Sequence, residues 1–545
     1  MLCVSADEQV VDAGESAFAK ANERLLGIHL GYEVFRSLHG DKKRVAVTDY
    51  SGTEPTEVHA QGLLVLATLL ADRLKELTAS ERVGIVLPPG AGATVANLAV
   101  VFAGKSPVNL NFSLGRAALE SSIERAGLEL VISADKVKAR LKDFPWPEGY
   151  LDVGEELKVL RSAKGKLFRR ALVLALPSGL AASLLKIPRS GGDVEAGLLF
   201  TSGSSGTPKG VSLSHRNLLA NCRQIRDIAV IAPGETLLGN LPLFHSFGFT
   251  VTLWFALLEG VNLVTVPSPL EVKKALGAIK ERSVTVLLGT PTFLRPFLKK
   301  ASPEDMASVR YVVSGAEKTP EGFAEKWESS FDCSYLEGYG LTETSPVLSI
   351  NRPDGLSRKG SVGKLMPGTA GRVLDPDSGE PRPPTETGLL CFRGPNVFSG
   401  YLGDHERSKE VLSGDGWFHT GDLGRFDEDG FLFIEGRLSR FSKIGGEMVP
   451  HGTVEQEIAK ALGVEQAERP LVAVAGKPDP AKGESLVLLA AVEVDFNALK
   501  TELVAAGFAN LWIPKEVKRV SEIPFLPTGK LDLKGIAQLA ADVEG

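Results

Sequence analysis

The chain of 545 residues is 43% hydrophobic and 23% charged, which is the composition of an ordinary soluble globular protein with room for more than one domain. Its formal net charge of −6 gives no reason to expect nucleic-acid binding. Its four cysteines form no CxxC pair, which argues against a zinc site or a disulfide framework and fits a reducing cytoplasm.

The first 60 residues predict a helical lead-in with an amphipathic helix over 27–39, and they lack the apolar run of a signal peptide. From residue 60 onward, helical and strand-like patterns alternate. The predicted helices cover 61–77, 93–103 and 117–126, and the predicted strands cover 82–87, 106–110 and 128–133. Such alternation is typical of parallel sheets covered by helices, so we expect an α/β fold.

The segment 171–185 is uncharged over its whole length but is too short to span a bilayer as one helix, and Pro177 interrupts it. Basic residues flank it on both sides: Lys164, Lys166, Arg169, Arg170, Lys186 and Arg189. Apolar residues between basic flanks suit a helical hairpin that lies in an anionic membrane surface. A buried connector within the N-terminal domain explains the same pattern, and the sequence leaves both interpretations open.

A loop rich in glycine and hydroxyl residues follows the apolar Leu199 and Phe200. Glycine lets the backbone approach phosphate oxygens closely, hydroxyl and N–H groups can donate to them, and a lysine adds positive charge. The spacing is not that of a Walker A motif, and a flexible surface loop is the plain alternative. We predict a polyphosphate-binding loop formed by Thr201, Ser202, Gly203, Ser204, Ser205, Gly206 and Lys209.

Helix–strand alternation resumes after this loop, with two further predicted strands at 309–314 and 333–339. From about 355 to 436, short strands broken by glycine and proline predict a small β-subdomain. The remaining residues, about 105, mix strands and helices and are enough for a compact α+β domain.

Two motifs place polar groups beside predicted strands. Tyr339 offers an aromatic face for adenine, Thr342 a hydroxyl for phosphate, and Glu343 a hard oxygen ligand for Mg²⁺. A strand that runs into a capped helix is the alternative for this motif. Asp422 can accept two hydrogen bonds from ribose hydroxyls, or it can stabilise a turn.

Five motifs in this order resemble those of the adenylate-forming superfamily: residues 201–210, 339–343, 420–422, 436–437 and 527–530. The resemblance implies an N-terminal AMP-binding domain at 1–438, built of two helix-covered sheets and the β-subdomain. It also implies a small mobile α+β domain at 440–545, and an active site between the two domains. The hinge falls near Ser439, where the family typically has Asp or Lys.

The resemblance also implies the cofactors ATP and Mg²⁺ and a role for each motif. Lys530 would act in adenylation and Lys443 in the later thioester-forming step, with Thr342 and Glu343 also catalytic and Glu343 the metal ligand. The residues implied in nucleotide binding, besides the phosphate loop, are Gly315, Ala316, Glu317, Tyr339, Gly340, Thr342, Asp422 and Arg437.

The implied acid pocket contains His245, Phe247, Gly289 and Thr290, in stretches without a charge that could receive an amino-acid ammonium group. A medium- or long-chain fatty acid therefore fits best. Within the superfamily, the chain is most similar to bacterial acyl-[acyl-carrier-protein] synthetases, which include the ligase half of 2-acylglycerophosphoethanolamine acyltransferase/acyl-carrier-protein synthetase.

That likeness implies transfer of the acyl group to acyl-carrier protein, with coenzyme A as the alternative acceptor. Cations for an acidic carrier protein are expected around the C-terminal domain, at Arg437, Arg440, Lys443, Lys515, Lys518 and Arg519. A cytoplasmic protein, peripheral to the inner face of the membrane if 164–189 contacts lipid, is the expected setting. A non-catalytic scaffold is disfavoured because Glu343 and Lys530 are present. A lysolipid acyltransferase is also disfavoured, because no His-x-x-x-x-Asp arrangement is evident beside a pocket suited to its substrate.

Overall fold

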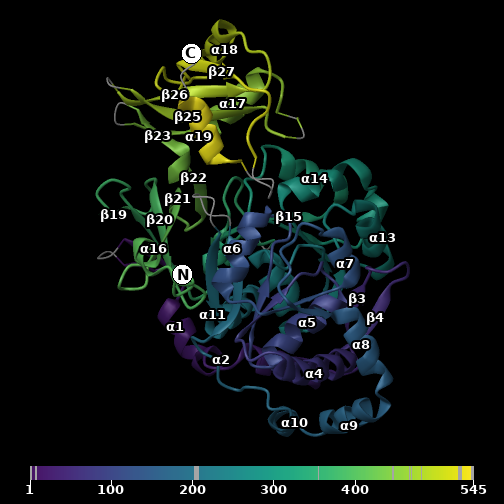
Figure 1. Cartoon of the computed structure of the whole chain (residues 1–545). Helices are drawn as coiled ribbons and strands as arrows, with labels where there is room; N and C mark the ends of the chain where they lie inside the picture. The colour runs from purple at the N-terminus through teal and green to yellow at the C-terminus, as the bar shows by residue number, and fades with distance from the viewer. Residues whose placement is uncertain are drawn as a thin grey trace.

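The computed structural model describes residues 3–5, 9–201, 208–353, 355–444, 447–465, 467, 469–479, 482–525 and 531–541. The strands within these ranges form four sheets. In Figure 1 the C-terminal sheet lies at the top of the molecule, above the much larger body that contains the other three sheets. This is the α/β architecture, with helix-covered sheets and a smaller C-terminal α+β unit, that the sequence predicts.

The first sheet has the strand order β10-β9-β6-β5-β7-β8 and is parallel except for the hairpin of β9 and β10. Its strands are β5 (Arg82–Ile85), β6 (Ser106–Asn109), β7 (Leu130–Ser133), β8 (Gly149–Asp152), β9 (Glu195–Thr201) and β10 (Lys209–Ser214). The helices α4 (Ala60–Leu77), α5 (Ala91–Phe102), α6 (Arg116–Ala126), α7 (Asp135–Arg140) and α8 (Val153–Ser162) alternate with these strands along the chain. Strands β5 to β7 and helices α4 to α6 therefore fall where the periodicity predicts them.

The second sheet has nine strands in the order β17-β16-β15-β14-β13-β11-β12-β3-β4, with a parallel centre and antiparallel edges. Its strands are β3 (Val45–Asp49), β4 (Thr56–His59), β11 (Thr236–Gly239), β12 (Asn262–Thr265), β13 (Val286–Gly289), β14 (Tyr311–Ser314), β15 (Ser334–Gly340), β16 (Val347–Ile350) and β17 (Lys364–Leu365). The accompanying helices are α11 (His215–Asp227), α12 (Ala256–Glu259), α13 (Val272–Arg282), α14 (Pro291–Lys300), η2 (Pro303–Asp305) and α15 (Phe323–Phe331).

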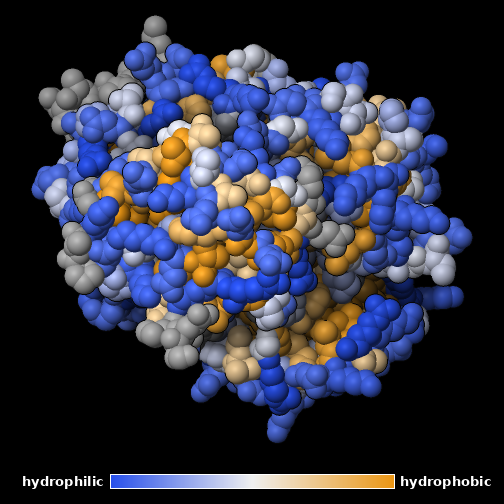
Figure 2. Space-filling model, turned by 90° about the horizontal axis from the view of Figure 1, so that it is seen from above, coloured by the Kyte–Doolittle hydropathy of each residue, from blue (hydrophilic) through white to orange (hydrophobic). Residues whose placement is uncertain are grey.

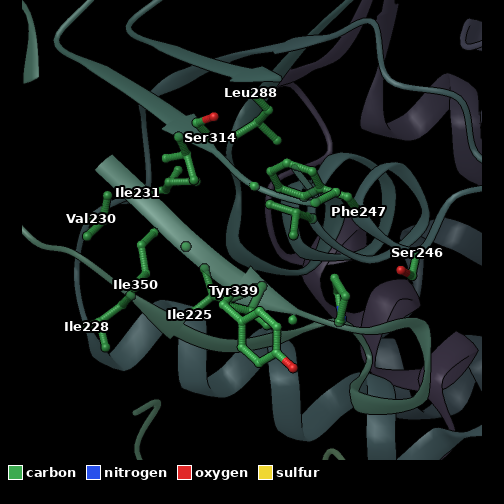
Figure 3. Close-up of a pocket in the computed structure, with 18 residues that line it drawn as sticks. Ile225, Ile228, Val230, Ile231, Ser246, Phe247, Leu288, Ser314, Tyr339 and Ile350 are labelled. Carbon is green, nitrogen blue, oxygen red and sulfur yellow. The ribbon is translucent and has the colours of Figure 1, made fainter. Parts of the chain in front are cut away.

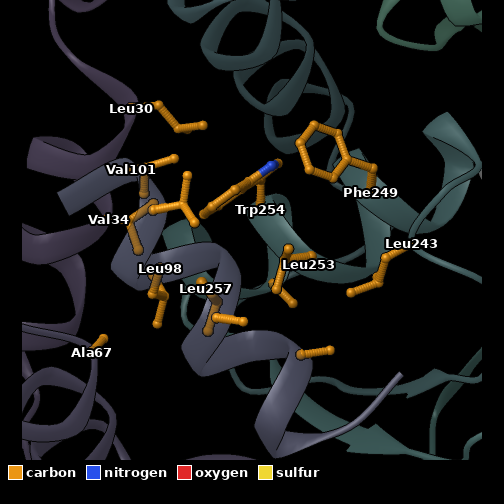
Figure 4. Close-up of a cluster of buried hydrophobic side chains, with 14 of the residues drawn as sticks. Leu30, Val34, Ala67, Leu98, Val101, Leu243, Phe249, Leu253, Trp254 and Leu257 are labelled. Atoms are coloured by element: carbon orange, nitrogen blue, oxygen red, sulfur yellow. The ribbon is translucent and has the colours of Figure 1, made fainter. Parts of the chain in front are cut away.

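The largest core surrounds Trp254, which is fully buried on η1 (Phe247–Phe255). Figure 4 shows its indole between Leu30 and Val34 on one side and Phe249 on the other, and the two aromatic ring centroids are 5.6 Å apart. The element η1 has the wide turns of a π-helix, and it carries Phe247 and Val251 into the wall of the cavity described below.

The expectation of a purely helical lead-in over the first 60 residues is wrong in part. The helices α1 (Glu15–Ala21), α2 (Glu23–Leu26) and α3 (Leu30–Gly40) are present, but β3 and β4 follow them, and β1 (Cys3–Ser5) and β2 (Val10–Asp12) precede them. Strand β2 pairs with β18 (Ala370–Leu374), more than 350 residues away along the chain. A three-residue strand has too few residues to show a period, so only its distant partner defines it.

Strand β18 belongs to the third sheet, which has the order β1-β2-β18-β20-β21-β22 with β19 paired to β18. Its other strands are β19 (Pro381–Arg382), β20 (Gly388–Arg393), β21 (Phe418–Phe426) and β22 (Leu432–Arg437), accompanied by α16 (His405–Val411). This sheet lies where the glycine-rich texture predicts a β-subdomain.

The fourth sheet follows the short turn η4 (Leu438–Arg440) and has the order β24-β23-β26-β25, with β27 paired to β26. Its elements are β23 (Phe441–Ile444), β24 (Glu447–Pro450), α17 (His451–Ala461), β25 (Val472–Asp479), β26 (Gly483–Ala490), α18 (Phe496–Ala505), β27 (Glu516–Arg519) and α19 (Leu533–Ala541). Seen from above, from the side of this unit, the surface is mostly hydrophilic, and hydrophobic residues gather in hollows between the hydrophilic ones (Figure 2).

The basic and apolar segment folds into the two short helices α9 (Lys164–Ala175) and α10 (Ser178–Leu184), which project from the lower end of the body in Figure 1. One face of this hairpin is buried against the core through Leu174, Ala181 and Ala182, while other side chains remain exposed. The segment is therefore not a connector enclosed on all sides. Among the described residues, no helix has the length and apolar character needed to cross a membrane.

Two neutral histidines are buried side by side near the start of α3. The ring centroids of His29 and His215 are 3.9 Å apart, and each Nδ1 accepts a backbone N–H, from Gly31 and Leu30 respectively. Burial lowers the pKa of His29 to about 4. Burial, and then the neighbouring His29, lowers the pKa of His215 to about 3.

We expect this pair to make the protein less stable as the pH falls from 6.5 toward 4, because unfolded imidazoles take up protons that the folded rings do not bind. The slope is about 1.4 kcal/mol per pH unit for each group. His29→Asn keeps a side-chain acceptor for Gly31 N–H and removes one titrating ring. Near neutral pH the variant and the wild type should have similar melting temperatures. At low pH the melting temperature of the variant should fall less than that of the wild type. Equal falls in melting temperature would contradict this account.

Candidate active site

The glycine-rich loop connects the ends of β9 and β10. Thr201 and Lys209 face each other in the last antiparallel pair of this hairpin, so the stem of the loop is fixed by the sheet. Ser202, Gly203, Ser204, Ser205 and Gly206 lie outside the described residues. Arg125 supports the stem by donating to the carbonyl oxygens of Pro208 at 2.7 Å and Leu402 at 3.1 Å.

Three cations gather where this stem meets the third sheet. Burial, followed by the positive charge of Arg407, lowers the pKa of Lys209; Glu343 opposes this effect, and Arg437 adds to it. The Lys209 ammonium also lies 5.1 Å from the centre of the Tyr401 ring. Like charges held near one another at a loop stem favour binding of a polyanion such as a nucleotide polyphosphate.

Glu343 lies on the short turn η3 (Thr342–Thr344), directly after β15. Tyr401 donates its hydroxyl to Oε1 of Glu343 at 2.9 Å, and Phe398 N–H donates to the Glu343 carbonyl at 2.8 Å. Glu343 forms no salt bridge with a described residue, and no cluster of three metal-ligating side chains occurs in the described part of the chain. A single carboxylate of this kind suits Mg²⁺, which binds to one or two carboxylates and completes its shell with phosphate oxygens and water.

Asp422 connects three strands of two different sheets. Tyr339 at the end of β15 donates its hydroxyl to Asp422 Oδ2 at 2.6 Å, and Arg437 at the end of β22 lies 2.9 Å from Oδ1 through its Nε. Burial, and then the charge of Asp422, raises the pKa of Tyr339 well above its ordinary value. Asp422 in turn raises the pKa of Arg437. The carboxylate is nearly inaccessible, whereas 58% of the Arg437 side chain is exposed and can reach a ligand.

An apolar cavity begins on the other side of Tyr339, whose ring stands in its wall (Figure 3). The cavity holds about 690 Å³, counting the space at its open mouth, and none of the described residues that line it is charged. Its wall includes Ile225, Ile228, Ile231, Val251, Leu288 and Ile350. Tyr339 thus separates an apolar recess from the polar cluster around Asp422.

The remaining predicted nucleotide residues lie at the carboxyl ends of β14 and β15. Gly315 and Ala316 line the cavity, and Ala316 has a left-handed backbone with φ of 66°. Glu317 accepts from the backbone N–H and the hydroxyl of Thr292 at 3.1 and 2.7 Å. At Gly340 a Cβ would stand 1.9 Å from the Pro346 carbonyl oxygen, so only glycine fits.

The predicted acid-pocket residues are divided between the cavity and its surroundings. Phe247 lines the cavity, while His245 is exposed, with its ring 4.8 Å from that of Phe244. Thr290 caps the start of α14 through its side chain, and a Cβ on Gly289 would collide with Leu294. Periodicity does not indicate which residue of β13 turns toward the cavity. In the structure Leu288, and not the predicted Gly289, lines it.

Of the two predicted catalytic lysines, Lys530 lies outside the described residues, and Lys443 is held away from the polar cluster. Lys443 Nζ lies 2.6 Å from Oδ2 of Asp377, between β18 and β19, so it joins the C-terminal unit to the third sheet. Both side chains are half exposed, and such pairs contribute only about 0–1 kcal/mol. The contact can therefore be exchanged for another at little cost.

The basic surface expected for an acidic carrier protein is largely neutralised within the protein. Arg440 pairs with buried Glu455, Lys515 lies 2.5 Å from Asp479, and buried Lys518 donates to backbone carbonyls of α19. With Arg437 on Asp422 and Lys443 on Asp377, five of these six cations already have partners. Arg437, Lys443 and Lys515 nevertheless keep half or more of their side chains exposed, so the basic surface for a carrier protein stays a prediction.

Sequence reasoning did not identify Tyr401, Arg407 or Ser246. Tyr401 contacts both Glu343 and Lys209. The charge of Arg407 adds to the effect of burial in lowering the pKa of Lys209. The Ser246 hydroxyl lies 3.4 Å from the Thr342 hydroxyl. Tyr401 and Arg407 stand in an ordinary loop and at a helix start, without a motif. The helix start could have been noticed, since Asp404 is an evident cap for α16.

A family model of AMP-binding enzymes matches residues 35–402, well over half of the chain, and the chain therefore belongs to this family. It is consequently an AMP-forming acid–thiol ligase that activates its acid with ATP through an acyl adenylate.

Its relatives differ in the acid that they activate. The chain is 31% identical to a sulfoacetate–CoA ligase of Cupriavidus necator, over 71% of this chain and 76% of that protein. It is 28% identical to a long-chain-fatty-acid–CoA ligase of Bacillus subtilis, over 84% of this chain and 85% of that protein. The ATP-bound structure of MatB from Rhodopseudomonas palustris superposes with a TM-score of 0.76 at 26% identity, covering 93% of this chain and 98% of that one.

Proposed function

We propose that the acid activated by this ligase is a medium- or long-chain fatty acid. The observation that carries the proposal is the apolar cavity beside Tyr339, which has no charged lining residue among those described. A sulfonate or a second carboxylate in such a recess would be left without a counter-ion, at a large desolvation cost. An acyl chain, by contrast, gains free energy from burial. The fatty-acid ligase among the relatives supports the same acid.

We infer the following roles for the polar cluster. Lys209 and Arg407 bind the polyphosphate, Glu343 would hold Mg²⁺, and Asp422 together with Arg437 receives the ribose. The metal supplies charge neutralisation at the phosphates when bound. The fatty-acid carboxylate attacks the α-phosphorus of ATP, the bond to the β-phosphate oxygen breaks, and pyrophosphate leaves. A thiol then attacks the acyl carbonyl and AMP leaves, after the C-terminal unit turns about Ser439.

Two acceptors for the acyl group are candidates. Coenzyme A is favoured by the names of the fatty-acid relatives. The cations of the C-terminal unit do not distinguish the two acceptors, because coenzyme A also needs cations for its phosphates. Acyl-carrier protein is favoured by the likeness of residues 241–248, 311–318 and 436–449 to acyl-carrier-protein synthetases. We take coenzyme A as the first candidate and the carrier protein as the second.

The test is a thioester assay with ATP, Mg²⁺ and palmitate, in which coenzyme A and holo acyl-carrier protein are offered in separate reactions. Palmitoyl-CoA as the main product is the expected result. Product on the carrier protein alone would make the carrier protein the acceptor, while the fatty acid would remain the proposed substrate. No pyrophosphate release with palmitate, but release with a short or polar acid, would overturn the fatty-acid proposal.

Filling the cavity should change the acyl chain length that is accepted. Val251 lines the cavity from η1, so Val251→Phe is expected to lower kcat/KM for palmitate about tenfold or more while octanoate changes little. The measurement is pyrophosphate release across a series of even-numbered acids. Val504→Phe, at a half-exposed position on α18, is the matched control. Equal loss for all chain lengths would place the acyl chain elsewhere.

Lys443→Ala should separate the two half-reactions. If Lys443 leaves Asp377 and reaches the acyl adenylate only when the C-terminal unit rotates, thioester formation should fall about 100-fold while acyl-adenylate formation stays within about threefold. The two rates are measured by single-turnover thioester formation and by hydroxylamine trapping of the adenylate. Lys477→Ala, in strand β25 of the same sheet, is the control. Equal losses in both half-reactions would contradict the assigned role.

We also propose that the segment 164–189 contacts a membrane, which would place the enzyme at the inner face of the bilayer, close to its apolar substrate. The apolar run between basic flanks supports this contact.

A further inference from the structure

The outer face of the α9–α10 hairpin exposes four large hydrophobic side chains. Phe168 and Leu172 on α9 are 66% and 55% exposed, and Leu180 and Leu184 on α10 are 51% and 56% exposed. In each helix the two residues are four positions apart, so they lie on the same helical face. Single exposed leucines are common on protein surfaces, but four on two adjoining short helices form a patch.

The hairpin is anchored to the body, so the exposed patch is not the result of a frayed end. Leu174, Ala181 and Leu185 of the same hairpin are buried in the main core. The carbonyl oxygen of Leu174, near the end of α9, accepts from Lys42 Nζ at 2.8 Å and lies 3.0 Å from the His39 ring. The inner face is thus held in place while the outer face remains open.

The charge of the segment is entirely positive. Residues 164–189 contain six basic residues and no acidic residue, in a chain whose formal net charge is −6. Lys164, Lys166, Arg169 and Lys186 are exposed and form no ion pair with any residue that the structure describes. Arg170 pairs with Asp72 of α4. Burial lowers the pKa of Lys75 on the same helix, Asp72 opposes this, and the nearby charges of Lys186 and Arg170 add to it.

We propose that this outer face, with Phe168, Leu172, Leu180 and Leu184 as inserting side chains and Lys164, Lys166, Arg169 and Lys186 around them, docks on a bilayer that carries anionic lipids. Apolar side chains enter the boundary between headgroups and acyl chains, while the surrounding lysines and arginines attract anionic headgroups. A second copy of the chain fits this face less well, because two such segments would bring like charges together.

The docked orientation leaves the C-terminal unit free. In Figure 1 the hairpin lies at the bottom of the molecule and the C-terminal sheet at the top. A bilayer against α9 and α10 would therefore not obstruct rotation of the C-terminal unit about Ser439. Docking through α9 and α10 rests on the membrane contact proposed above for 164–189, and it does not depend on the acid or the acceptor.

The experiment is co-sedimentation of the full-length protein with vesicles, in the absence of ATP and acid. Phosphatidylcholine vesicles are compared with vesicles that contain about one third phosphatidylglycerol. We expect binding to the anionic vesicles to exceed binding to the neutral ones by about tenfold or more, and to weaken as salt rises.

Two pairs of matched variants identify the surface. Phe168→Ser with Leu172→Ser should lower vesicle affinity about tenfold, whereas Leu270→Ser with Val504→Ser, at exposed hydrophobic positions elsewhere, should not. Lys164→Glu with Lys166→Glu should remove the preference for anionic vesicles, whereas Lys299→Glu with Lys300→Glu on α14 should keep it. The thermal unfolding temperature checks that each variant is folded.

Three results would overturn the proposal: wild-type protein that stays in the supernatant with anionic vesicles, equal binding to both kinds of vesicle, or hairpin variants that bind as well as their matched controls. A wild-type dimer, measured by light scattering, that the Phe168 and Leu172 substitutions convert to a monomer would also overturn it, by assigning the face to a second copy. Pyrophosphate release in vesicle-free buffer reports separately on the ligase proposal, so the two proposals can fail independently.

Discussion

Glu343→Gln is expected to lower the rate of acyl-adenylate formation at least about 100-fold, the largest effect that we predict for a described residue. The substitution keeps the size of the side chain and an acceptor for the Tyr401 hydroxyl, so the fold around η3 should persist. It removes the only negative charge that we assign to Mg²⁺. It also leaves Lys209, Arg407 and Arg437 with one fewer opposing charge.

Two further variants separate metal binding from local packing. Tyr401→Phe removes the hydroxyl that orients Glu343 and should cost about tenfold or less, because the carboxylate remains. Glu410→Gln, on the exposed side of α16, should leave the rate unchanged. The rates are measured by pyrophosphate release with palmitate over a range of Mg²⁺ concentrations. If Glu343→Gln kept a normal rate and normal Mg²⁺ dependence, the metal assignment would be wrong.

Asp422→Asn is expected to raise KM for ATP about 10- to 100-fold, with a smaller effect on kcat. Asparagine preserves an acceptor for Tyr339, but it loses the charge that attracts Arg437 and that would accept strongly from ribose hydroxyls. The effect on stability should be small, about 1 kcal/mol, because the Arg437 side chain is more than half exposed and water replaces its partner.

The decisive measurement compares ATP with 2′-deoxy-ATP. If Asp422 receives the ribose hydroxyls, the wild-type enzyme should prefer ATP, and Asp422→Asn should lose most of that preference. Asp429→Asn, in an exposed turn of the same subdomain, is the control. An Asp422→Asn enzyme that discriminates between the two nucleotides as well as the wild type would assign the carboxylate to positioning Arg437 alone.

The helices and parallel strands between residues 60 and 133 could be predicted from local patterns. In α4 the buried residues recur at helical spacing, and β7 is a short, wholly buried run of mostly apolar residues. The order of strands in the sheets could not be predicted this way. Strand β2 is defined by its hydrogen bonds to β18, and η1 by wide turns around buried Trp254. Both depend on contacts between residues that are far apart along the chain.

The site divides in the same manner. Tyr339, Glu343, Asp422 and Arg437 could be proposed as site residues from sequence because each stands in a short motif. Tyr339 and Glu343 lie at the carboxyl end of β15, where α/β sheets place ligand-binding groups, whereas Asp422 lies within the antiparallel strand β21 and Arg437 at the end of β22. The motifs do not show that the Tyr339 hydroxyl reaches Asp422, 83 positions later.

Amino-acid order by itself determined which residues carry charge, hydroxyls and conformational freedom, and therefore the α/β class and the basic, apolar character of 164–189. The role of 201–209 in binding phosphate stays a prediction from that order. Only the tertiary structure decided which partners those residues meet. It placed Tyr401 on Glu343, paired the bases of the C-terminal unit with acids, and left one face of α9 and α10 exposed. The physical reason is that composition and periodicity are local properties, whereas pairing and burial depend on distant segments that fold into contact.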